Sequence, residues 1–354
     1  MQLLVEPEWQ VLNRWLDQRG VMTSSSETRN LPWRTYRTMH NADVLRWCAT
    51  TSHLSDNFEA IESIAGQCLA FLIKARRADG CVHHVVDGNG AMCSDENDAI
   101  VQAHVARALA ALSVSELPHA MTQPARDWWR QYADLPQGPL SPDVAAEWLL
   151  ALCPLAEQEG NWVRDKVRRL SAYLLDECFY PVRTSDWEWF EDRWRPGAAL
   201  IPAALWAACE VCEHKRLTSV AQVTTRFVVD NVFEEGLLLP IGTQGSWSRT
   251  SAKPIFQQVT PEAASIVELL CTAQRASLRP TYGEFAEYAI RWFSGNNLRG
   301  ERMVDEATGL CARGISEAGV DRYPSVTATV ACMNAHATFM QQAVVIEDFV
   351  AYSG

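Results

Sequence analysis

The connections between the helical segments of this chain alternate in length, and this alternation constrains the fold more than any other feature. Apolar residues recur at helical spacing through most of the 354-residue sequence, which predicts a succession of helices. The predicted segments are 6–19, 41–52, 56–76, 97–114, 123–134, 142–156, 160–176, 197–213, 216–231, 261–276, 281–295 and 325–343. Connections after even-numbered segments are short, and those after odd-numbered segments are long, except for 135–141.

This alternation predicts how the helices are arranged. Antiparallel helices joined in sequence place odd-to-even connections at one end and even-to-odd connections at the other. We therefore predict an all-α fold, an (α/α)6 toroid of six helical hairpins that forms a single domain over residues 1–354, with its long loops on one rim. An open helical solenoid is the competing architecture, but the sequence lacks the fixed repeat period of such arrays. Long loops in a compact domain are usually functional, so we expect a site on the elaborated rim.

Charge and composition argue against several classes of partner. The formal net charge is −12 and the pI is about 5.2, whereas nucleic acids and anionic membranes both require a positive face. The first twenty residues do not read as a signal peptide, and no apolar run is long enough to cross a bilayer. Most of the eleven cysteines fall in apolar helical segments, which indicates a reducing compartment. We therefore expect a cytoplasmic protein with no nucleic-acid and no membrane partner.

The sequence contains no convincing metal or cofactor motif. His83 and His84 are adjacent in a turn-rich stretch, and the sequence has no HExxH motif to support a zinc site. Cys209 and Cys212 form a CxxC inside a helical run, where thiols are usually small core residues. P-loop, GxGxxG and GxSxG motifs are absent from the sequence. We expect neither a metal nor a cofactor.

Tryptophans and carboxylates are mixed in the loop 186–194, just before the eighth segment. Indoles stack on the apolar faces of sugar rings, although large aromatics also pin long loops to the body of a protein. Glycosidase clefts combine aromatics with two carboxylates, one protonating the leaving oxygen and the other acting as base or nucleophile. For a single carboxylate, a helix cap or a solvated charge is the simpler interpretation. The collection of such residues on one rim is the informative observation.

Several stretches resemble a known family. WEWFEDRWRPGAALIPAALWAA at 187–208, and the run at 290–336 that begins IRWFSGNN, are similar to signatures of six-hairpin glycosidase-like domains that often accompany bacterial glycosyltransferases. IFQQVTPEAA at 255–264 and TYRTMHNADVL at 35–45 resemble further signatures of the same family more weakly. The resemblance covers most of the chain in the family's order. It implies a bacterial (α/α)6 toroid that acts on or binds a saccharide, with a glycosyltransferase as a candidate partner.

The chain departs from the family pattern at several acidic or amide positions. Met39-His40-Asn41 stands where the family has Asp-Asp-Asn, and Arg195-Pro196-Gly197 stands where it has a Tyr and an Asn. Arg313 replaces an Asp, and Tyr323-Pro324-Ser325-Val326 replaces Gly-Ala-Glu-Ser. Acid–base cleavage of a glycoside needs two placed carboxylates, so these losses weaken the case for a working hydrolase.

Three functional hypotheses remain open. The first is a divergent glycan-active enzyme, a glycoside hydrolase or a lyase, that uses carboxylate acid–base chemistry in a Trp-lined cleft. The second is a catalytically silent toroid that binds a saccharide or a partner enzyme; Arg195 and Arg313 would suit an acidic sugar or a phosphate. The third is the same scaffold repurposed for a non-sugar substrate.

The candidate site residues follow from the rim and from the resemblance. The candidate catalytic residues are Glu191 and Asp192, with a partner carboxylate from Asp98, Glu262 or Asp321. The candidate substrate-binding residues are Trp187, Trp189, Trp247, His40, Asn41, Arg195, Arg249, Gln257, Asn297 and Arg313. Two carboxylates roughly 5–10 Å apart across the cleft would support hydrolysis. An ion pair of Glu191 with Arg195 or Arg313, with no second carboxylate in reach, would count against it.

Overall fold

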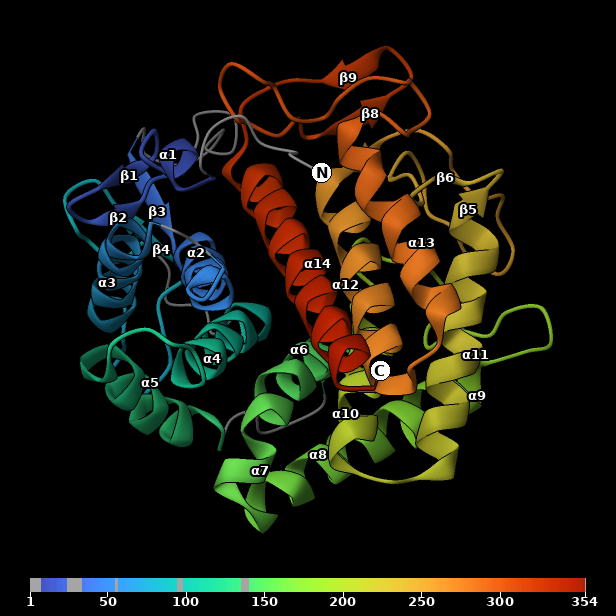
Figure 1. Cartoon of the computed structure of the whole chain (residues 1–354), viewed down its shortest axis with the longest axis horizontal. Coiled ribbons are helices and arrows are strands. Elements are labelled where there is room, and N and C mark those ends of the chain that lie inside the picture. Colours follow the sequence, from blue (N-terminus) through green and yellow to red (C-terminus); the bar gives the residue numbers. More distant parts are fainter. Residues whose placement is uncertain (1–7, 24–33, 55–56, 94–97, 135–139, 354) are drawn as a thin grey trace.

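The inner helices of the molecule form a closed ring. The computed structural model describes residues 8–23, 34–54, 57–93, 98–134 and 140–353, and within them six helices make up this ring. They are α2 (Thr38–Thr51), α4 (Ala99–Ser113), α6 (Pro142–Leu152), α10 (Leu200–Val211), α12 (Thr260–Ser277) and α14 (Val326–Ser353). Each packs against the next in this order, and α14 packs against α2 (Figure 1). The predicted (α/α)6 toroid is therefore confirmed.

Outer helices cover the ring from outside. They are the short α1 (Glu8–Leu12), then α3 (Phe58–Lys74), α5 (His119–Tyr132), α8 (Asn161–Tyr173), α11 (Lys215–Val232) and α13 (Pro280–Arg291). From α3 onward, each packs on the inner helix that precedes it in the chain. Within the described residues, none of these helices is long and apolar enough to cross a membrane.

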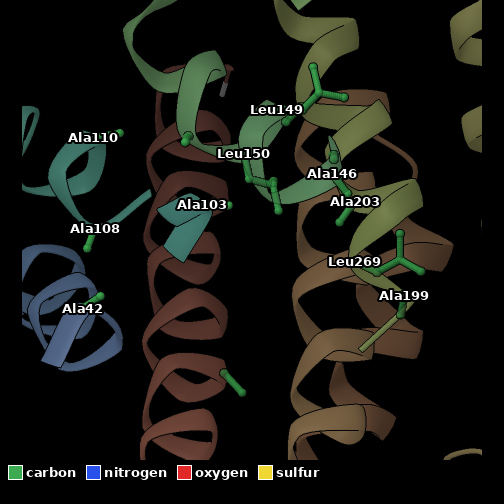
Figure 2. Packing of buried hydrophobic residues seen from close by; sticks show 14 of the residues in the cluster. Ala42, Ala103, Ala108, Ala110, Ala146, Leu149, Leu150, Ala199, Ala203 and Leu269 are labelled. Atoms are coloured by element: carbon green, nitrogen blue, oxygen red, sulfur yellow. The ribbon is translucent and has the colours of Figure 1, made fainter. Parts of the chain in front are cut away.

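Side-chain burial distinguishes the two layers of helices. The inner helix α10 buries an unbroken run of residues from Ile201 to Ala208, which is typical of a helix surrounded by protein. The outer helix α8 buries Val163, Val167 and Ser171, a single stripe at spacing four. Small side chains let the inner helices approach closely. Figure 2 shows such alanines, among them Ala146, where α6 meets α10.

The long connections run from each outer helix to the next inner helix, and short strands tie them together. These are β1 (Leu16–Asp17) with β2 (Gly20–Val21), β3 (Thr35–Arg37) with β4 (Val85–Asp87), β5 (Phe233–Glu234) with β6 (Leu237–Leu238), and β7 (Gln258–Val259) with β8 (Gly314–Ser316) and β9 (Gly319–Asp321). All pairs are antiparallel. Pairs β3–β4 and β7–β8 join connections that belong to neighbouring hairpins. The elaborated rim is thus a cross-linked layer over the N-terminal ends of the inner helices (Figure 1).

The helix predicted over 6–19 is wrong beyond Leu12. The chain turns there and forms the β1–β2 hairpin, in which Leu16 pairs with Val21. Asp17 fixes this turn, because its carboxylate accepts hydrogen bonds from the Arg19 N–H at 2.8 Å and the Tyr36 hydroxyl at 2.6 Å. Parts of the predicted loops, at 24–33, 94–97 and 135–139, lie outside the described residues.

The close contact between inner helices gives a stability prediction. Ala146 is fully buried on α6, so Ala146→Leu places an isobutyl group where a methyl group fits. Overpacking of this kind should lower the free energy of unfolding by about 1–3 kcal/mol. The matched control is Ala70→Leu on the exposed side of α3, with an expected change within about 0.5 kcal/mol. Urea denaturation measures both, and equal values for the two variants would contradict tight packing of the ring.

Candidate active site

A cavity of about 320 Å³ lies inside the ring, and every inner helix contributes to its wall. We call it the central pocket. Its polar lining residues are Asp43, Arg46, His104, Arg107, Asp143, Glu147, Ser265, Glu268, Thr327 and Asn334. They belong largely to the N-terminal halves of the inner helices, so the pocket lies on the side of the elaborated rim. Helix N-termini carry partial positive charge, which favours electron-rich oxygen atoms in such a place.

Ion pairs cross the floor of this pocket from helix to helix. The charged cluster, as we name it, consists of Asp43, Arg46, His104, Arg107, Glu147 and Glu268. Arg107 of α4 donates to Glu147 of α6 at 2.9 Å and also to Glu268 of α12. Arg46 of α2 donates to the other oxygen of Glu268 at 3.3 Å. One guanidinium thus bridges two carboxylates, and the ring is joined across its interior.

An imidazole–carboxylate pair completes the cluster. His104 Nδ1 lies 2.8 Å from Asp43 Oδ1, a hydrogen-bond distance. The other ring nitrogen, Nε2, lies 3.9 Å from Glu147 Oε1, which is longer than a hydrogen bond. Nδ1 is therefore held by Asp43, while Nε2 keeps its capacity to bond a further group in the pocket.

Helical spacing explains why these side chains meet. Residues three or four apart lie on the same face of a helix. Asp43 and Arg46 are so spaced on α2, as are His104 and Arg107 on α4. Each helix therefore presents two functional groups to the interior, one turn apart.

The pKa shifts show which cluster members carry charge. Burial alone would lower the pKa of His104, but the charges of Asp43 and Glu147 outweigh it and raise that pKa. Burial would likewise raise the pKa of Asp43 and Glu147, yet His104 and Arg46 hold that of Asp43, and Arg107 and His104 that of Glu147, below the usual range. Burial lowers the pKa of Arg107 to about 10, so the guanidinium remains charged at neutral pH. With His104 protonated, three positive groups face three carboxylates, and the buried charge is balanced.

Asp143 is the carboxylate of the central pocket that stands apart from the charged cluster. Its Oδ1 is buried and has no hydrogen-bond partner among the residues that the structure describes. Glu191 lies close enough for the Asp143 charge to act on it. Burial is the main cause that raises the pKa of Glu191, and the Asp143 charge raises it further against the opposing effect of Arg195. The Arg195 guanidinium forms an ion pair with Glu191 at 2.9 Å.

The predicted sugar-binding tryptophans are buried in a structural cluster. Trp187, Trp189, Trp194 and Trp247 are each at most 9% exposed. All but Trp194 contact the ring of Phe227 of α11, and Trp194 packs on Trp189 and Trp247. Trp189 stacks on Trp194 with ring centroids 4.4 Å apart, and Phe227 stacks on Trp247 at 5.6 Å. Their ring faces are covered by one another, so they anchor the 186–194 loop to the body. In the described part of the chain, no tryptophan lines the central pocket.

Glu262 is buried beneath the same loop. Its carboxylate accepts hydrogen bonds from Trp194 Nε1 at 2.8 Å and from the Gly197 N–H. Burial raises the pKa of Glu262 to about 7, although both hydrogen bonds favour its ionised form. This side chain fastens the loop to the first turn of α12 and has no opening to a substrate.

Two further predicted acids serve local structure. Asp98 caps α4 by accepting a hydrogen bond from the Ile100 N–H at 3.2 Å. Asp192 is largely exposed and forms an ion pair with Arg249 at 3.0 Å. Neither side chain reaches the central pocket.

Three further predicted polar residues lie at the start of α2 or on the last long connection, and two of them bond to backbone groups. Asn41 accepts from the Val21 N–H at 2.8 Å, which attaches β2 to α2. Asn297 donates to two backbone carbonyls at 2.8 Å each. His40 is buried, and its Nε2 lies 2.9 Å from Thr327 Oγ1. Because Thr327 lines the central pocket, His40 stands directly behind its wall.

The remaining predicted residues lie out on the rim. Arg313 and Asp321 form an ion pair at 2.6 Å, and the Arg313 guanidinium also lies over the ring of Tyr323. Gln257 is exposed and has left-handed backbone with φ of 61°. These contacts shape the β7–β8–β9 sheet.

None of the residues predicted for catalysis or binding belongs to the described lining of the central pocket. Glu262, Arg195 and His40 are adjacent in sequence to lining residues but point elsewhere. The signal that would have found the pocket is a set of charged residues within apolar, alanine-rich helices. Such residues are rarely buried unless they are paired. Among the described residues, no group of three or more His, Cys, Asp or Glu side chains is placed to hold a metal ion.

Glu262 gives a pH-dependent prediction. Because its pKa is about 7 in the folded chain and 4.5 ordinarily, the folded state holds this proton more tightly than the unfolded state. The free energy of unfolding should therefore fall as the pH rises from about 4.5 to 7, by on the order of 3 kcal/mol from this group. Glu262→Gln removes that dependence. Urea denaturation at pH 5 and pH 8 should show the variant gaining stability relative to wild type at pH 8; a pH-independent difference would contradict the assignment.

Comparison with known proteins identifies the fold of this chain, but it finds no match at the level of sequence. No family model matches the sequence, and no curated protein matches it. Solved structures match along nearly the whole chain. A sugar epimerase from a ruminal bacterium superposes with a TM-score of 0.69 at 14% identity, covering 95% of this chain and 97% of its own.

Two more structures of different activity superpose as well. A D-mannose isomerase gives a TM-score of 0.69 at 12% identity, covering 94% of this chain and 96% of its own. The GH76 α-mannanase of Bacteroides thetaiotaomicron gives 0.66 at 9% identity, covering 96% and 95%. At these identities the likeness concerns the fold. The (α/α)6 toroid implied by the sequence resemblance is thereby confirmed as the fold, and these three structures share it with this chain.

Proposed function

We propose that this chain is a sugar isomerase or epimerase, which moves a proton between positions next to the carbonyl of a monosaccharide bound in the central pocket. The observation that carries the proposal is the arrangement of His104 and Asp143 on the wall of one cavity. His104 is held by Asp43 through Nδ1 and has Nε2 beyond hydrogen-bond distance of Glu147. Asp143 has a buried oxygen without a partner in the described structure.

The two groups suit the acid and the base of an enolisation. Asp143 would take the proton from the carbon next to the carbonyl, and the C–H electrons would form the C=C bond of an enediol. The carbonyl oxygen would receive the proton of His104 Nε2, since the neighbouring carboxylates favour the protonated imidazole. For the isomer, Asp143 returns its proton to the former carbonyl carbon, while the hydroxyl of the neighbouring carbon gives its proton to His104 Nε2 and becomes the new carbonyl. For the epimer, the enediol turns over, Asp143 returns its proton to the opposite face of the same carbon, and the first oxygen gives its proton back to His104 Nε2. Both reactions conserve atoms and need no redox partner.

The pocket itself supports a small polar substrate. Its volume of about 320 Å³ lies at the lower end of the range of about 300–1,000 Å³ for ligand sites, which suits one sugar ring better than a polymer. Ser265, Thr327 and Asn334 add hydroxyl and amide groups to its wall. The sugar epimerase and the D-mannose isomerase with the same fold make this reaction class the natural one to test.

Glycoside hydrolysis is the second candidate, and one observation favours it. Glu191 has a raised pKa, as a general acid requires, and Asp143 is near enough to influence it. The ion pair between Glu191 and Arg195 counts against this role. The second carboxylate would be Asp143 instead of Asp98, Glu262 or Asp321. A silent saccharide-binding role and an association with a glycosyltransferase stay predictions.

Paired variants separate the two reactions. His104→Asn keeps a donor toward Asp43 but removes Nε2, and Asp143→Asn keeps the shape but removes the base. Each should lower the rate of monosaccharide isomerisation or epimerisation by about 10²–10⁴-fold. The melting temperature should change little in Asp143→Asn, whereas it should fall in His104→Asn, because that change leaves the Asp43 carboxylate without its charged partner. The assay is ¹H NMR of the full chain with a panel of aldoses, ketoses and aryl glycosides.

Glu191→Gln is the discriminating control for this assay. We expect it to retain monosaccharide conversion, because Glu191 has no part in the enolisation. If wild type releases sugar from a glycoside, converts no monosaccharide and loses the release in Glu191→Gln, the isomerase proposal is overturned in favour of the hydrolase.

A further inference from the structure

A second cavity, of about 600 Å³, lies at the opposite end of the ring. We call it the rear pocket. Its wall comes largely from the C-terminal halves of the inner helices, including Thr50 of α2, Ala207 of α10 and Gln342 of α14. It shares Arg46, Arg107 and Glu268 with the central pocket. The charged cluster is therefore the partition between two cavities on one axis.

We infer that the rear pocket is a second ligand site, for a neutral polyhydroxylated molecule such as a sugar or a sugar alcohol. The inference does not depend on the proposed function of the central pocket. It rests on the way the lining charges are paired and on which polar atoms are left over.

Most of the charges in the rear pocket are paired. Its described lining holds three arginines and three glutamates, and the exposed Glu116 is the one without an ion pair among the described residues. Arg275 pairs with Glu210 through contacts of 3.1 and 3.2 Å, and Glu268 pairs with both Arg46 and Arg107. An ionic ligand would have to compete with these pairs and lose the hydration of a full charge, which costs a neutral ligand much less.

The polar atoms left over are one donor and one acceptor. In the described structure, Arg46 Nε and Gln342 Oε1 are buried and have no hydrogen-bond partner, and both residues line the rear pocket. Buried polar groups normally have partners. A hydroxyl group is both donor and acceptor, so a ligand with several hydroxyls can satisfy both atoms.

The rest of the rear-pocket wall combines polar and apolar groups. Hydroxyl groups of Thr50, Thr272 and Thr338 stand among the carbon surfaces of Ala111 and Leu150. The last carbonyl groups of each helix lack intrahelical donors, and several helices end around this cavity. Hydroxyl donors on one face of a sugar and C–H groups on the other would complement such a wall.

The test is ¹⁹F NMR line broadening of 2-deoxy-2-fluoro-D-glucose by the full chain. Ala207 lines the rear pocket and not the central pocket, and the reverse holds for Ala264. Ala207→Phe therefore reduces the volume of the rear pocket, and Ala264→Phe that of the central pocket. We expect the Ala264→Phe protein to retain binding and the double variant to lose at least nine-tenths of it. Equal binding by Ala264→Phe and the double variant would overturn the inference, as would loss of all binding in Ala264→Phe alone.

A second variant protects this test against misfolding. Gln342→Leu removes the buried acceptor with little change in volume, and it should weaken rear-pocket binding in the Ala264→Phe background by fivefold or more. Unchanged affinity would contradict the role of this acceptor. Glucose 6-phosphate and glucosamine should compete at least tenfold more weakly than glucose; stronger competition by either would overturn the neutral ligand class. Failure of the isomerase assay would leave these outcomes unaffected.

Discussion

The bridge that Arg107 makes between Glu147 and Glu268 is the interaction on which the interior of this molecule depends. Charges enclosed by apolar helices are strongly unfavourable unless each has a partner, and here the partners come from different helices. Removal of any one member would leave an unpaired charge in the ring. The charged cluster therefore explains two features together: the division of the interior into two pockets, and the raised pKa of His104 on the floor of one of them.

Much of the fold could be predicted from the sequence because connection length is a local property. The order of short and long connections is set by the hairpin topology, so it survives even where helix ends are misplaced. The first segment shows the limit: 6–19 has helical spacing, yet the turn held by Asp17 ends the helix at Leu12. The turn is stabilised by the hydrogen bond from Tyr36, and the local sequence pattern around 6–19 gives no sign of this partner 19 residues further along the chain.

The site was harder to predict because it depends on contacts that are not local in the sequence. Its residues are isolated charges in apolar helices, and their partners can be identified only once helices that are distant in the sequence are seen to pack together. The tryptophans and acidic residues that are conspicuous in the rim sequence have a structural role instead. Trp187, Trp189, Trp194 and Glu262 hold the long connections in place, and Arg195 neutralises Glu191. A residue pattern that resembles a family signature can thus serve the architecture of a rim, while the chemistry of the pocket beneath it is set by other residues.

The central claim is that the central pocket moves a proton to and from a sugar carbon. The most direct measurement is the incubation of the wild-type chain in D₂O with the monosaccharide that it converts, followed by ¹H and ²H NMR. The account predicts deuterium at the carbon next to the carbonyl, in product and in recovered substrate, because a carboxylate base exchanges its proton with solvent. Conversion or sugar release with no deuterium at any carbon would contradict it.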